Sequence, residues 1–338
     1  MSKCDIVIPV WNQPKETKIC LDSIIRNTGF PYNLLIIDNA SQDRTKKIIE
    51  EFKESHPELN IKIVNNETNE GFIKAVNKGI SISREKYISI LNNDTVVTEG
   101  WLSEMARILD ENPKIGIVNP SSNNLGQKKP RNTSLDKFAS LFKKDSGKYG
   151  ENMYCIGFCM LFRRSLIDEI GLFDEIYGMG NFEDTDFSMK AKKIGYLCVR
   201  SFGSYVYHKE GSSFKFFKHR DRMFENNKNI FESRWGKQKR ILFILNMDKI
   251  KDEYIEKMNN HIKENNWVYI AARKNNELQK KQIPCFNHYY YKDMLNIKIL
   301  LKILFKKKKF DYIYCGNNKL FRIIKFLKPV HKANLLIL

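Results

Sequence analysis

The sequence has no long hydrophobic run. No stretch of its 338 residues stays apolar over the roughly 18 residues that a membrane-spanning helix needs. The first residues, MSKCDIVIPVW, lead directly into a strand-like pattern, without the separate apolar region of a signal peptide. We therefore expect a cytoplasmic protein. Its length leaves room for two domains of about 150 residues each.

Cysteine is sparse and scattered. The chain has seven cysteines, and the closest pair, Cys155 and Cys159, reads CIGFC and does not form a CxxC element. This spacing gives no framework of disulfides and no zinc site, so we predict reduced thiols. The sequence also shows no internal repeat.

Acidic residues are scarce only in the last third of the chain. Residues 209–338 hold 30 Lys and Arg against 12 Asp and Glu, whereas residues 1–208 hold 28 against 27. This asymmetry predicts a surface that meets anions such as lipid headgroups, nucleic acid or a polyanionic acceptor. A general bias towards lysine, asparagine and isoleucine remains the alternative explanation.

The first half of the chain alternates between strand-like and helical patterns. Four apolar runs, CDIVIPV, NLLIID, IKIVNN and YISILNND, are each followed by a segment with a helical apolar face. Such alternation predicts an α/β fold with a parallel sheet. The polar segment SSNNLGQKKPRNTS then predicts a mobile lid or an insertion, and NMYCIGFCMLFRR after it returns to a strand pattern. A second series begins at Arg240, with strand patterns ILFILN, WVYIAA and FDYIYCG and with helices expected near residues 254–264 and 293–304. We therefore place a domain boundary near residue 235.

Polar residues follow each of the four strands. The strand ends read PVWN, DNAS, NNETNEG and NNDT. The fourth is the sharpest case, because the apolar run Tyr87 to Leu91 stops abruptly at Asn92, Asn93 and Asp94. In an open parallel sheet, ligands bind beyond the carboxyl ends of the strands, so a matching polar rim predicts a nucleotide-type ligand there. Taken alone, each polar group could also be a helix cap.

Seven stretches of residues 3–213 together resemble the family 2 glycosyltransferases of the GT-A fold, including a branch described as rhamnosyltransferases. They are VIPVWNQ, IIDNASQDRT, NETNEGFIKAVNKGI, ISILNNDTVVTEGW, IGFCMLFRRSLIDEIGLFDE, NFEDTDFSMKAKKIGY and VYHKEGSS. The resemblance implies a Rossmann-like nucleotide-binding sheet with mixed acceptor-side strands over residues 1–235. We expect residues 236–338 to form a small basic accessory α/β domain.

The resemblance implies a divalent metal site. Asp94 matches the last aspartate of the family's DxD-like element, which binds Mn²⁺ or Mg²⁺ and through it the donor diphosphate. Here the element reads NND, with Asn92 in place of the first aspartate and Asn93 matched to a ribose or phosphate contact. His208 matches the second metal ligand, and an imidazole suits Mn²⁺ better than Mg²⁺. A surface histidine at the end of a strand is the alternative for His208.

The segment NFEDTDF carries the implied general base. Asp184 matches the family's base, with Glu183 and Asp186 beside it. Three carboxylates in four residues repel one another, which can raise the pKa of one of them and make it a better base. The alternative is a helix amino terminus, where acidic residues interact favourably with the macrodipole. Both interpretations can hold together.

Further residues match donor-site positions of the family. They are Pro9, Trp11, Asn12, Asp38, Asn77, Gly157 and Arg163. The resemblance implies that Asp38 reads the nucleobase, that Trp11 packs against it, and that Pro9 and Asn12 shape the same loop. Asn77 corresponds to a donor-site helix, and Gly157 and Arg163 to the border of the sugar pocket. Trp11 could instead be part of the core.

The implied activity is inverting, metal-dependent sugar transfer. The donor would be a UDP- or dTDP-sugar, and the acceptor a cell-surface glycan or a lipid-linked saccharide at the inner face of the membrane. One alternative, a nucleotidyltransferase that makes the sugar nucleotide, needs a glycine-rich phosphate loop, and PVWNQPKE contains no glycine. Another alternative is a non-catalytic protein that binds anions or nucleic acid. The presence of Asp94, Asp184 and His208 argues against it, because such a protein does not require them. We therefore expect no nucleic-acid partner.

Overall fold

The chain divides into two compact units. The computed structural model describes residues 3–209, 220–245, 247, 250–273, 287–291, 305 and 307–338. The first unit comprises residues 1–150 and 154–230, and the second comprises residues 151–153 and 231–338. The division falls inside helix α8 (Arg220–Trp235), whereas the sequence placed a boundary near residue 235. In the part of the chain that the structure describes, no helix is both long and apolar enough to cross a bilayer.

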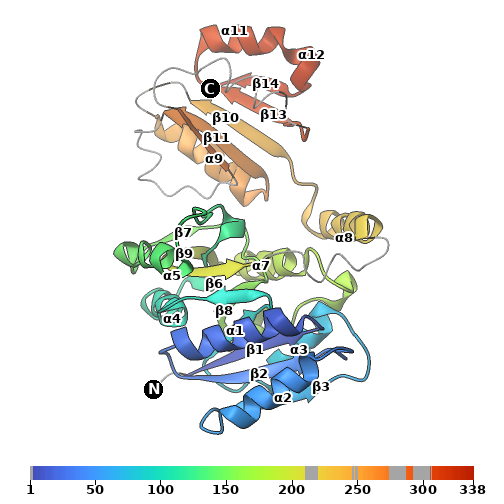
Figure 1. Ribbon diagram of the computed structural model, residues 1–338. Helices are drawn as coiled ribbons and strands as arrows, with labels where there is room; N and C mark the ends of the chain where they lie inside the picture. The colour runs from blue at the N-terminus through green and yellow to red at the C-terminus, as the bar shows by residue number, and fades with distance from the viewer. Residues whose placement is uncertain are drawn as a thin grey trace. The chain divides into compact units, whose positions relative to one another are not determined.

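The four predicted βα units open the first unit (Figure 1). The strands are β1 (Cys4–Val10), β2 (Tyr32–Asp38), β3 (Ile61–Asn65) and β4 (Tyr87–Leu91). The helices are α1 (Pro14–Asn27), α2 (Thr45–Ser55), α3 (Phe72–Ile82) and α4 (Trp101–Glu111). The strands are parallel in the order β3-β2-β1-β4, which confirms the prediction of a parallel sheet.

The sheet becomes mixed beyond β4. Its remaining strands are β5 (Thr95–Val97), β6 (Ile115–Ser121), β7 (Tyr149–Glu151), β8 (Cys159–Arg163) and β9 (Leu197–His208). The order continues β4-β8-β6-β9-β5, and β8 is antiparallel to both β4 and β6. Because β8 runs backwards, the residues just before it lie at the carboxyl end of β4. This reversal places Gly157 and Phe158 next to the NND segment.

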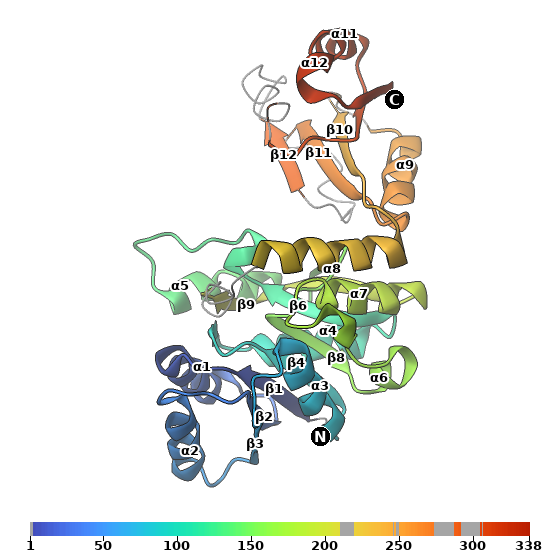
Figure 2. The same ribbon diagram turned by 90° about the vertical axis from the view of Figure 1, so that its right-hand side faces the viewer.

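Helices cover both faces of the parallel strands (Figure 2). Side chains from α1, α2 and α4 share one buried cluster with alternate residues of β1, including Ile6 and Ile8. Helix α3 packs on the opposite face, where a Cβ added to Gly79 would lie 2.3 Å from Val7 Cγ1. Alternation of the β1 side chains therefore supplies both layers of core.

Further elements complete the first unit, together with the first part of α8. They are η1 (Asn123–Leu125), α5 (Leu135–Ser140), η2 (Lys143–Asp145), α6 (Ser165–Ile170), η3 (Glu175–Tyr177) and α7 (Glu183–Lys193). The polar segment expected to be a lid or insertion begins with the ordered turn η1, whose side chains bond the end of β9. The expected strand NMYCIGFCMLFRR narrows to β8 alone.

The second unit is a small parallel α/β layer. Its strands are β10 (Arg240–Leu245), β11 (Trp267–Arg273), β12 (Asn287–Tyr291), β13 (Tyr312–Cys315) and β14 (Asn334–Ile337), in the order β12-β11-β10-β13-β14. Its helices are α9 (Asp252–Lys263), α11 (Asn318–Phe326) and α12 (Lys328–His331). The sequence predicted β10, α9, β11 and β13, but not β12, α11 or β14. The helix expected near residues 293–304 lies outside the described residues.

Candidate active site

Asp94 and His208 meet although 113 residues separate them. Strand β5 begins directly after Asp94 and pairs antiparallel with the end of β9, with Thr95 opposite His208. The His208 Nε2 atom lies 3.0 Å from Asp94 Oδ1, and both side chains are largely buried. The structure thus brings together the two residues that were predicted as metal ligands, a carboxylate oxygen and an imidazole nitrogen.

The turn η1 fixes His208 from the other side. Asn123 accepts a hydrogen bond from the His208 backbone N–H at 2.8 Å and donates to the His208 carbonyl at 2.7 Å. Asn124 Nδ2 lies 2.9 Å from His208 Nδ1, and the imidazole stacks on the Phe158 ring with centroids 5.0 Å apart. Orientation of a ligating histidine through its second nitrogen is a recurrent feature of metal sites. Neither asparagine was singled out from the sequence.

The oxygen atoms around this pair suit a hard divalent cation. Asn92 Oδ1 is buried without a hydrogen-bond partner, so a neutral oxygen acceptor lies in the same short segment as Asp94. Among the described residues, no group of three or more His, Cys, Asp or Glu side chains could hold a metal alone. The residues present therefore fit a cation that completes its coordination with donor oxygens and water.

Asp184 lies in the first turn of α7, half buried and tightly bonded. Its Oδ2 accepts the backbone N–H of Gly157 at 2.8 Å, and its Oδ1 accepts the backbone N–H of Thr185 at 2.6 Å. Burial raises the pKa of the Asp184 carboxyl, while these hydrogen bonds oppose the rise. A carboxylate with a raised pKa is a stronger proton acceptor when it is ionised.

Two consecutive residues connect Asp184 to the Asp94–His208 pair. Gly157 bonds Asp184, and Phe158 both stacks on His208 and accepts the Asn92 backbone N–H at 2.8 Å. A Cβ added to Gly157 would lie 3.5 Å from Asp184 Cβ, at ordinary contact distance, so the two residues are close neighbours. The carboxylate and the candidate metal ligands therefore border one site.

The two neighbours of Asp184 have different environments. Glu183 is 6% exposed, its Oε2 has no hydrogen-bond partner, and burial together with the charge of Asp184 raises its pKa to about 8. Asp186 is fully buried, accepts the Tyr177 hydroxyl at 3.1 Å and lies 3.4 Å from Lys190 Nζ. Asp186 therefore links α7 to η3. Glu183 is instead buried next to Asp184, and the charge of Asp184 acts on it directly.

The carboxyl end of β2 is organised by a residue that the sequence reading passed over. Asn39 is 4% exposed and bonds Asn69 Oδ1 at 2.7 Å, the Gly71 carbonyl at 3.1 Å and Asn66 Nδ2 at 2.8 Å. Its amide joins the segments that follow β2 and β3 to the start of α3. Its position inside the polar rim, directly after Asp38, was the signal available in the sequence.

The predicted nucleobase residues lie at this same sheet end. Pro9 pairs with Ile37 in the β1–β2 ladder, and Asp38 Oδ1 accepts the Ser41 backbone N–H at 3.1 Å. Asn12 adopts φ 56° and binds the loop after β2, donating its backbone N–H to Ser41 Oγ at 2.8 Å. The partly exposed Trp11 lies between these two positions in the chain.

The Asn93 side chain is bonded to helix α1 and to the loop before it. Its Nδ2 donates to Thr17 Oγ1 at 2.9 Å and to the Asn12 carbonyl at 3.4 Å. The side chain therefore joins the NND segment to the first loop, and it is 6% exposed. These contacts support the loop geometry of the site.

Two predicted residues lie apart from this cluster. The Asn77 amide bonds the Phe173 backbone, donating to its carbonyl at 2.9 Å and accepting its N–H at 3.1 Å. Arg163 pairs with Tyr87 at the opposite end of β4 from Leu91 and donates to the carbonyls of Ile115 and Leu109. The placement of Arg163 at the border of the sugar pocket is thus corrected, because β8 runs antiparallel and carries it to the other end of the sheet.

The comparisons with known proteins agree with this architecture. The sequence profile described as "Glycosyl transferase family 2" matches residues 5–171. The chain therefore belongs to the family 2 glycosyltransferases. This glycosyltransferase is 27% identical over 173 residues to a poly-beta-1,6-N-acetyl-D-glucosamine synthase of Staphylococcus epidermidis, covering 50% of this chain and 41% of the relative. It is 26% identical to the uncharacterized glycosyltransferase YwdF of Bacillus subtilis, covering 56% and 68%.

Solved structures show the same fold for this glycosyltransferase. A mannosyltransferase from Pyrobaculum calidifontis, in complex with GDP-Man and Mn²⁺, aligns with a TM-score of 0.51 at 19% identity. The alignment covers 63% of this chain and 58% of the mannosyltransferase. The fold of the first unit is therefore GT-A, as the sequence predicted. The chain spans about two fifths of the length of the glucosamine polymer synthase.

Proposed function

We propose that this glycosyltransferase moves a sugar from a nucleotide-sugar donor to an acceptor hydroxyl with inversion at the anomeric carbon and with a divalent metal bound. The observation that carries the proposal is the Gly157–Phe158 segment, which contacts Asp184 on one side and His208 on the other. A base and a pair of metal-ligating side chains thereby border the same space. Inverting displacement requires them on opposite sides of the reacting carbon.

Asp94 and His208 would hold Mn²⁺ or Mg²⁺. Their contact at 3.0 Å and the unpartnered Asn92 Oδ1 support this assignment, and the mannosyltransferase of similar fold was solved with Mn²⁺. Such a cation supplies positive charge next to the donor diphosphate as negative charge develops there. Asn124 and Phe158 would keep the imidazole in the orientation that this binding needs.

Asp184 would act as the general base. The acceptor oxygen forms a bond to the anomeric carbon, the bond from that carbon to the diphosphate oxygen breaks, and the hydroxyl proton passes to the Asp184 carboxylate. The nucleoside diphosphate leaves with the bonding electrons. The Gly157 and Thr185 N–H groups fix both carboxylate oxygens, so Asp184 is already oriented before the acceptor arrives.

The rim at β1 and β2 would bind the nucleoside. Asp38 and Trp11 would contact the base of a UDP- or dTDP-sugar, with Pro9 and Asn12 shaping the loop and Asn93 and Gly157 nearer the phosphates and sugar. We place the acceptor among cell-surface glycans or lipid-linked saccharides, on the cytoplasmic side of the membrane. The named activity of the staphylococcal relative, a polysaccharide synthase, supports this choice of acceptor class.

A panel of nucleotide sugars tests the proposal directly. Full-length protein with Mn²⁺ is heated with each UDP-, dTDP- and GDP-sugar, because a bound donor raises the melting temperature by mass action. The best donor is then assayed for release of nucleoside diphosphate, with and without EDTA. We expect one donor class to stabilise the protein and to turn over only with metal. Stabilisation by no donor, or turnover that survives EDTA, contradicts the proposal.

A further inference from the structure

The turn before Asp184 holds two residues in a costly conformation. Asn181 and Phe182 have φ angles of 76° and 73°, in the left-handed region, directly before α7. Phenylalanine adopts this left-handed conformation only at a cost in free energy, whereas asparagine tolerates it better. Such a turn persists only where surrounding contacts hold it. The contacts that hold this turn therefore also determine where α7, and with it Asp184, begins.

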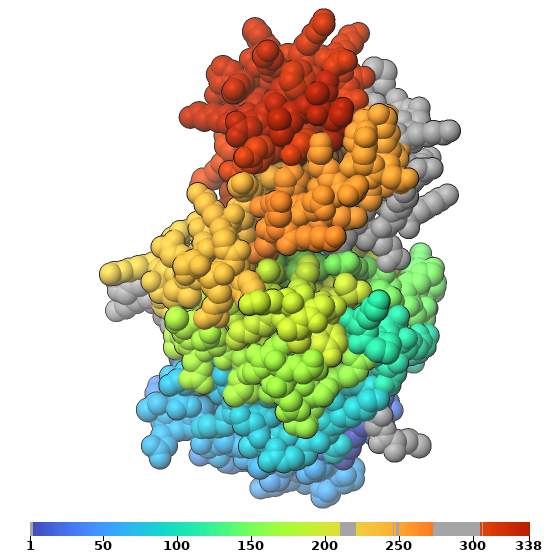
Figure 3. Space-filling model, turned by 180° about the vertical axis from the view of Figure 1, so that it is seen from behind, coloured from blue at the N-terminus to red at the C-terminus, as the bar shows by residue number. Residues whose placement is uncertain are grey.

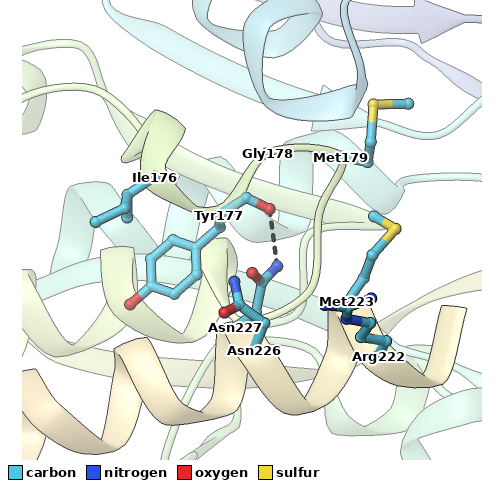
Figure 4. Close-up of a pocket in the computed structure, with 8 residues that line it drawn as sticks. All are labelled: Ile176, Tyr177, Gly178, Met179, Arg222, Met223, Asn226 and Asn227. Atoms are coloured by element: carbon cyan, nitrogen blue, oxygen red, sulfur yellow. Dashed lines mark hydrogen bonds between the residues drawn. The ribbon is translucent and has the colours of Figure 1, made fainter. Parts of the chain in front are cut away.

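The side-chain amide of Asn227, on α8, contacts three carbonyls of the turn. Asn227 Nδ2 lies 2.8 Å from the Tyr177 carbonyl, 2.8 Å from the Gly180 carbonyl and 3.3 Å from the Asn181 carbonyl. Figure 4 shows the amide pointing from α8 at Tyr177 O. Asn227 is 4% exposed, and every residue in this contact belongs to the first unit.

The space around the amide is shaped as a groove between α8 and the turn. The groove has a volume of about 390 Å³ and is lined by Ile176, Tyr177, Gly178, Met179, Arg222, Met223, Asn226 and Asn227. The Tyr177 ring that borders it reaches Asp186 on α7. Asp184 and Asp186 lie about 200° apart around the helix, so the groove lies on the side of α7 away from Asp184. The Asn227 amide therefore contacts the turn on the side of α7 that faces away from Asp184.

We infer that Asn227 is a positioning residue for sugar transfer. The two N–H groups of its amide bond the carbonyls of Tyr177 and Gly180 and share a longer contact with the carbonyl of Asn181. These bonds set the start of α7 and so the approach of Asp184 to the Gly157 N–H. Phe224 of the same helix supports the turn, with its ring 5.2 Å from the Phe182 ring. This inference rests on the proposed role of Asp184. It assigns the amino-terminal half of α8 a role in positioning the base for sugar transfer.

Asn227→Leu tests the inference, since leucine keeps the size of the side chain but has no donor for the three carbonyls. We expect kcat to fall roughly 10- to 100-fold, with the donor KM within about threefold of the wild-type value, because only the base is misplaced. Asn226→Leu is the matched control on the same helix and the same groove, and it should keep kcat within about twofold.

Amide hydrogen exchange gives a second readout that does not depend on turnover. In Asn227→Leu, the amides of residues 178–186 should exchange faster, while those of β1 and β2 keep their wild-type protection. If kcat and exchange both stay unchanged, the inference is wrong. Equal losses of kcat and donor affinity also overturn it, because they indicate general destabilisation. If wild-type protein transfers no sugar, the proposed function fails, while the exchange result still decides the positioning role.

A second inference comes from a different surface, the outer face of α11. Lys319, Arg322, Ile323 and Phe326 follow the spacing i, i+3, i+4, i+7, which places them along one side of the helix. All four are exposed, Phe326 at 85% and Ile323 at 47%. We call these four residues the α11 stripe.

The segment that contains the α11 stripe carries charge of one sign. Residues 318–338 contain five Lys and Arg and no Asp or Glu. On the face of the sheet that α11 covers, Ile337 of β14 is also exposed, at 49%. Figure 3 shows this segment, in red, at the surface of the second unit. Exposed apolar side chains among unopposed cations are unfavourable in water and favourable at an anionic lipid surface.

The geometry points to the α11 stripe as a membrane-binding surface for anionic lipids. Phe326 and Ile323 would enter the interfacial layer, and the flanking cations would pair with lipid phosphates and carboxylates. A second copy of the chain is a poorer occupant, because it would place the same cations against each other.

Sedimentation of full-length protein with vesicles tests this surface. Vesicles of phosphatidylcholine alone are compared with vesicles that also contain phosphatidylglycerol. We expect binding only to the anionic vesicles, at least fivefold weaker for Phe326→Ser, and lost for the double variant Lys319→Glu, Arg322→Glu. Leu141→Ser, which changes a 57% exposed leucine of the first unit, is the control and should bind as wild type does.

Three outcomes overturn the membrane assignment. They are absence of wild-type binding to anionic vesicles at low salt, equal binding by Phe326→Ser, and unchanged binding at roughly 1 M salt, where the Debye length is about 3 Å. If Phe326→Ser instead abolishes a concentration-dependent self-association, the surface joins two copies of the chain. The vesicle result is independent of catalysis, so it stands or falls separately from the proposed function.

Discussion

A carboxylate is buried at each end of the β3-β2-β1-β4 sheet, but the two carboxylates have different bonding partners. At the amino ends, Asp5 is 3% exposed and accepts the backbone N–H groups of Arg84 at 2.7 Å and Glu85 at 3.0 Å, with Asn33 Nδ2 at 2.8 Å. At the carboxyl ends, Asp94 faces a histidine and the nearby Asn92 Oδ1 has no partner. At the amino end the carboxylate is held by three donors of the protein itself, whereas at the carboxyl end the carboxylate lies beside a side chain that can ligate a metal.

This difference shows that burial of a carboxylate does not by itself indicate a site. A carboxylate that accepts several backbone N–H groups is stabilised in its ionised form and serves the fold. Asp94 instead lies beside an imidazole nitrogen and close in the chain to an unpartnered amide oxygen, and atoms of these kinds can bind divalent cations. The comparison therefore assigns structure to the amino ends and chemistry to the carboxyl ends, and each assignment can be tested by substitution.

The largest effect is expected for Asp184→Asn. The substitution keeps the size of the side chain but removes the proton acceptor, so kcat should fall by on the order of 10² to 10⁴. Donor affinity, measured by calorimetry with Mn²⁺, should stay within about threefold. Asp5→Asn is the control from the other end of the sheet, and it should lower the melting temperature while it preserves kcat. A parallel loss of donor affinity in Asp184→Asn would indicate a structural role.

Asn124→Leu should have the next largest effect, on metal affinity. The Asn124 amide donates to His208 Nδ1, and its Oδ1 is buried without a partner. When Nε2 binds a cation, Nδ1 must carry the proton, and rotation of the amide presents Oδ1 to accept it. Without this partner, Mn²⁺ affinity should fall about 10- to 100-fold.

Electron paramagnetic resonance of free Mn²⁺ measures that affinity without turnover. The paired variant is Asn124→Asp, which always offers an acceptor to Nδ1–H and should bind Mn²⁺ at least as tightly as wild type. Equal weakening by both substitutions would show that Asn124 acts through packing alone.

Glu183→Gln should have a smaller effect that depends on pH. Burial and Asp184 raise the pKa of Glu183 to about 8, so the folded protein holds a proton that the unfolded chain releases near its ordinary value of about 4.3. The stability gained from this proton is complete below pH 4.3 and is lost as the pH rises through 8. Glutamine mimics the protonated form at every pH, so the variant should melt higher than wild type at pH 9.

Melting curves at pH 5 and pH 9 measure the difference. Each kcal/mol gained corresponds to about 2–4 °C for a domain of this size, and the gain should be far smaller at pH 5. A difference in melting temperature that is the same at both pH values would show that the proton is not responsible.

The sequence predicted the sheet and the residues of its rim because the apolar periodicity and the polar strand ends are local patterns. The contact of Asp94 with His208 was also predictable, but only through resemblance to a family, since it depends on β5 pairing with a strand more than a hundred residues later. Asn39, Asn124 and Asn227 were missed for a physical reason. An asparagine that bonds distant backbone groups looks in sequence like any polar surface residue, and only the folded chain shows which carbonyls it meets.

Arg163→Met should have the smallest effect on function. It tests most directly whether the amino end of the sheet serves stability alone. The sequence placed Arg163 at the sugar pocket, whereas the structure bonds its guanidinium to the carbonyls of Ile115 and Leu109 at the amino end of β4. Methionine keeps the apolar stem but leaves both acceptors without the charged donor, which should cost roughly 1–3 kcal/mol of stability. Donor affinity should change less than about twofold. The control is Arg164→Met, which removes only an exposed contact to Asp168 at 3.4 Å and should cost at most about 1 kcal/mol. A tenfold loss of donor affinity in Arg163→Met, with an unchanged melting temperature, would return this arginine to the sugar pocket and break the division between the two ends.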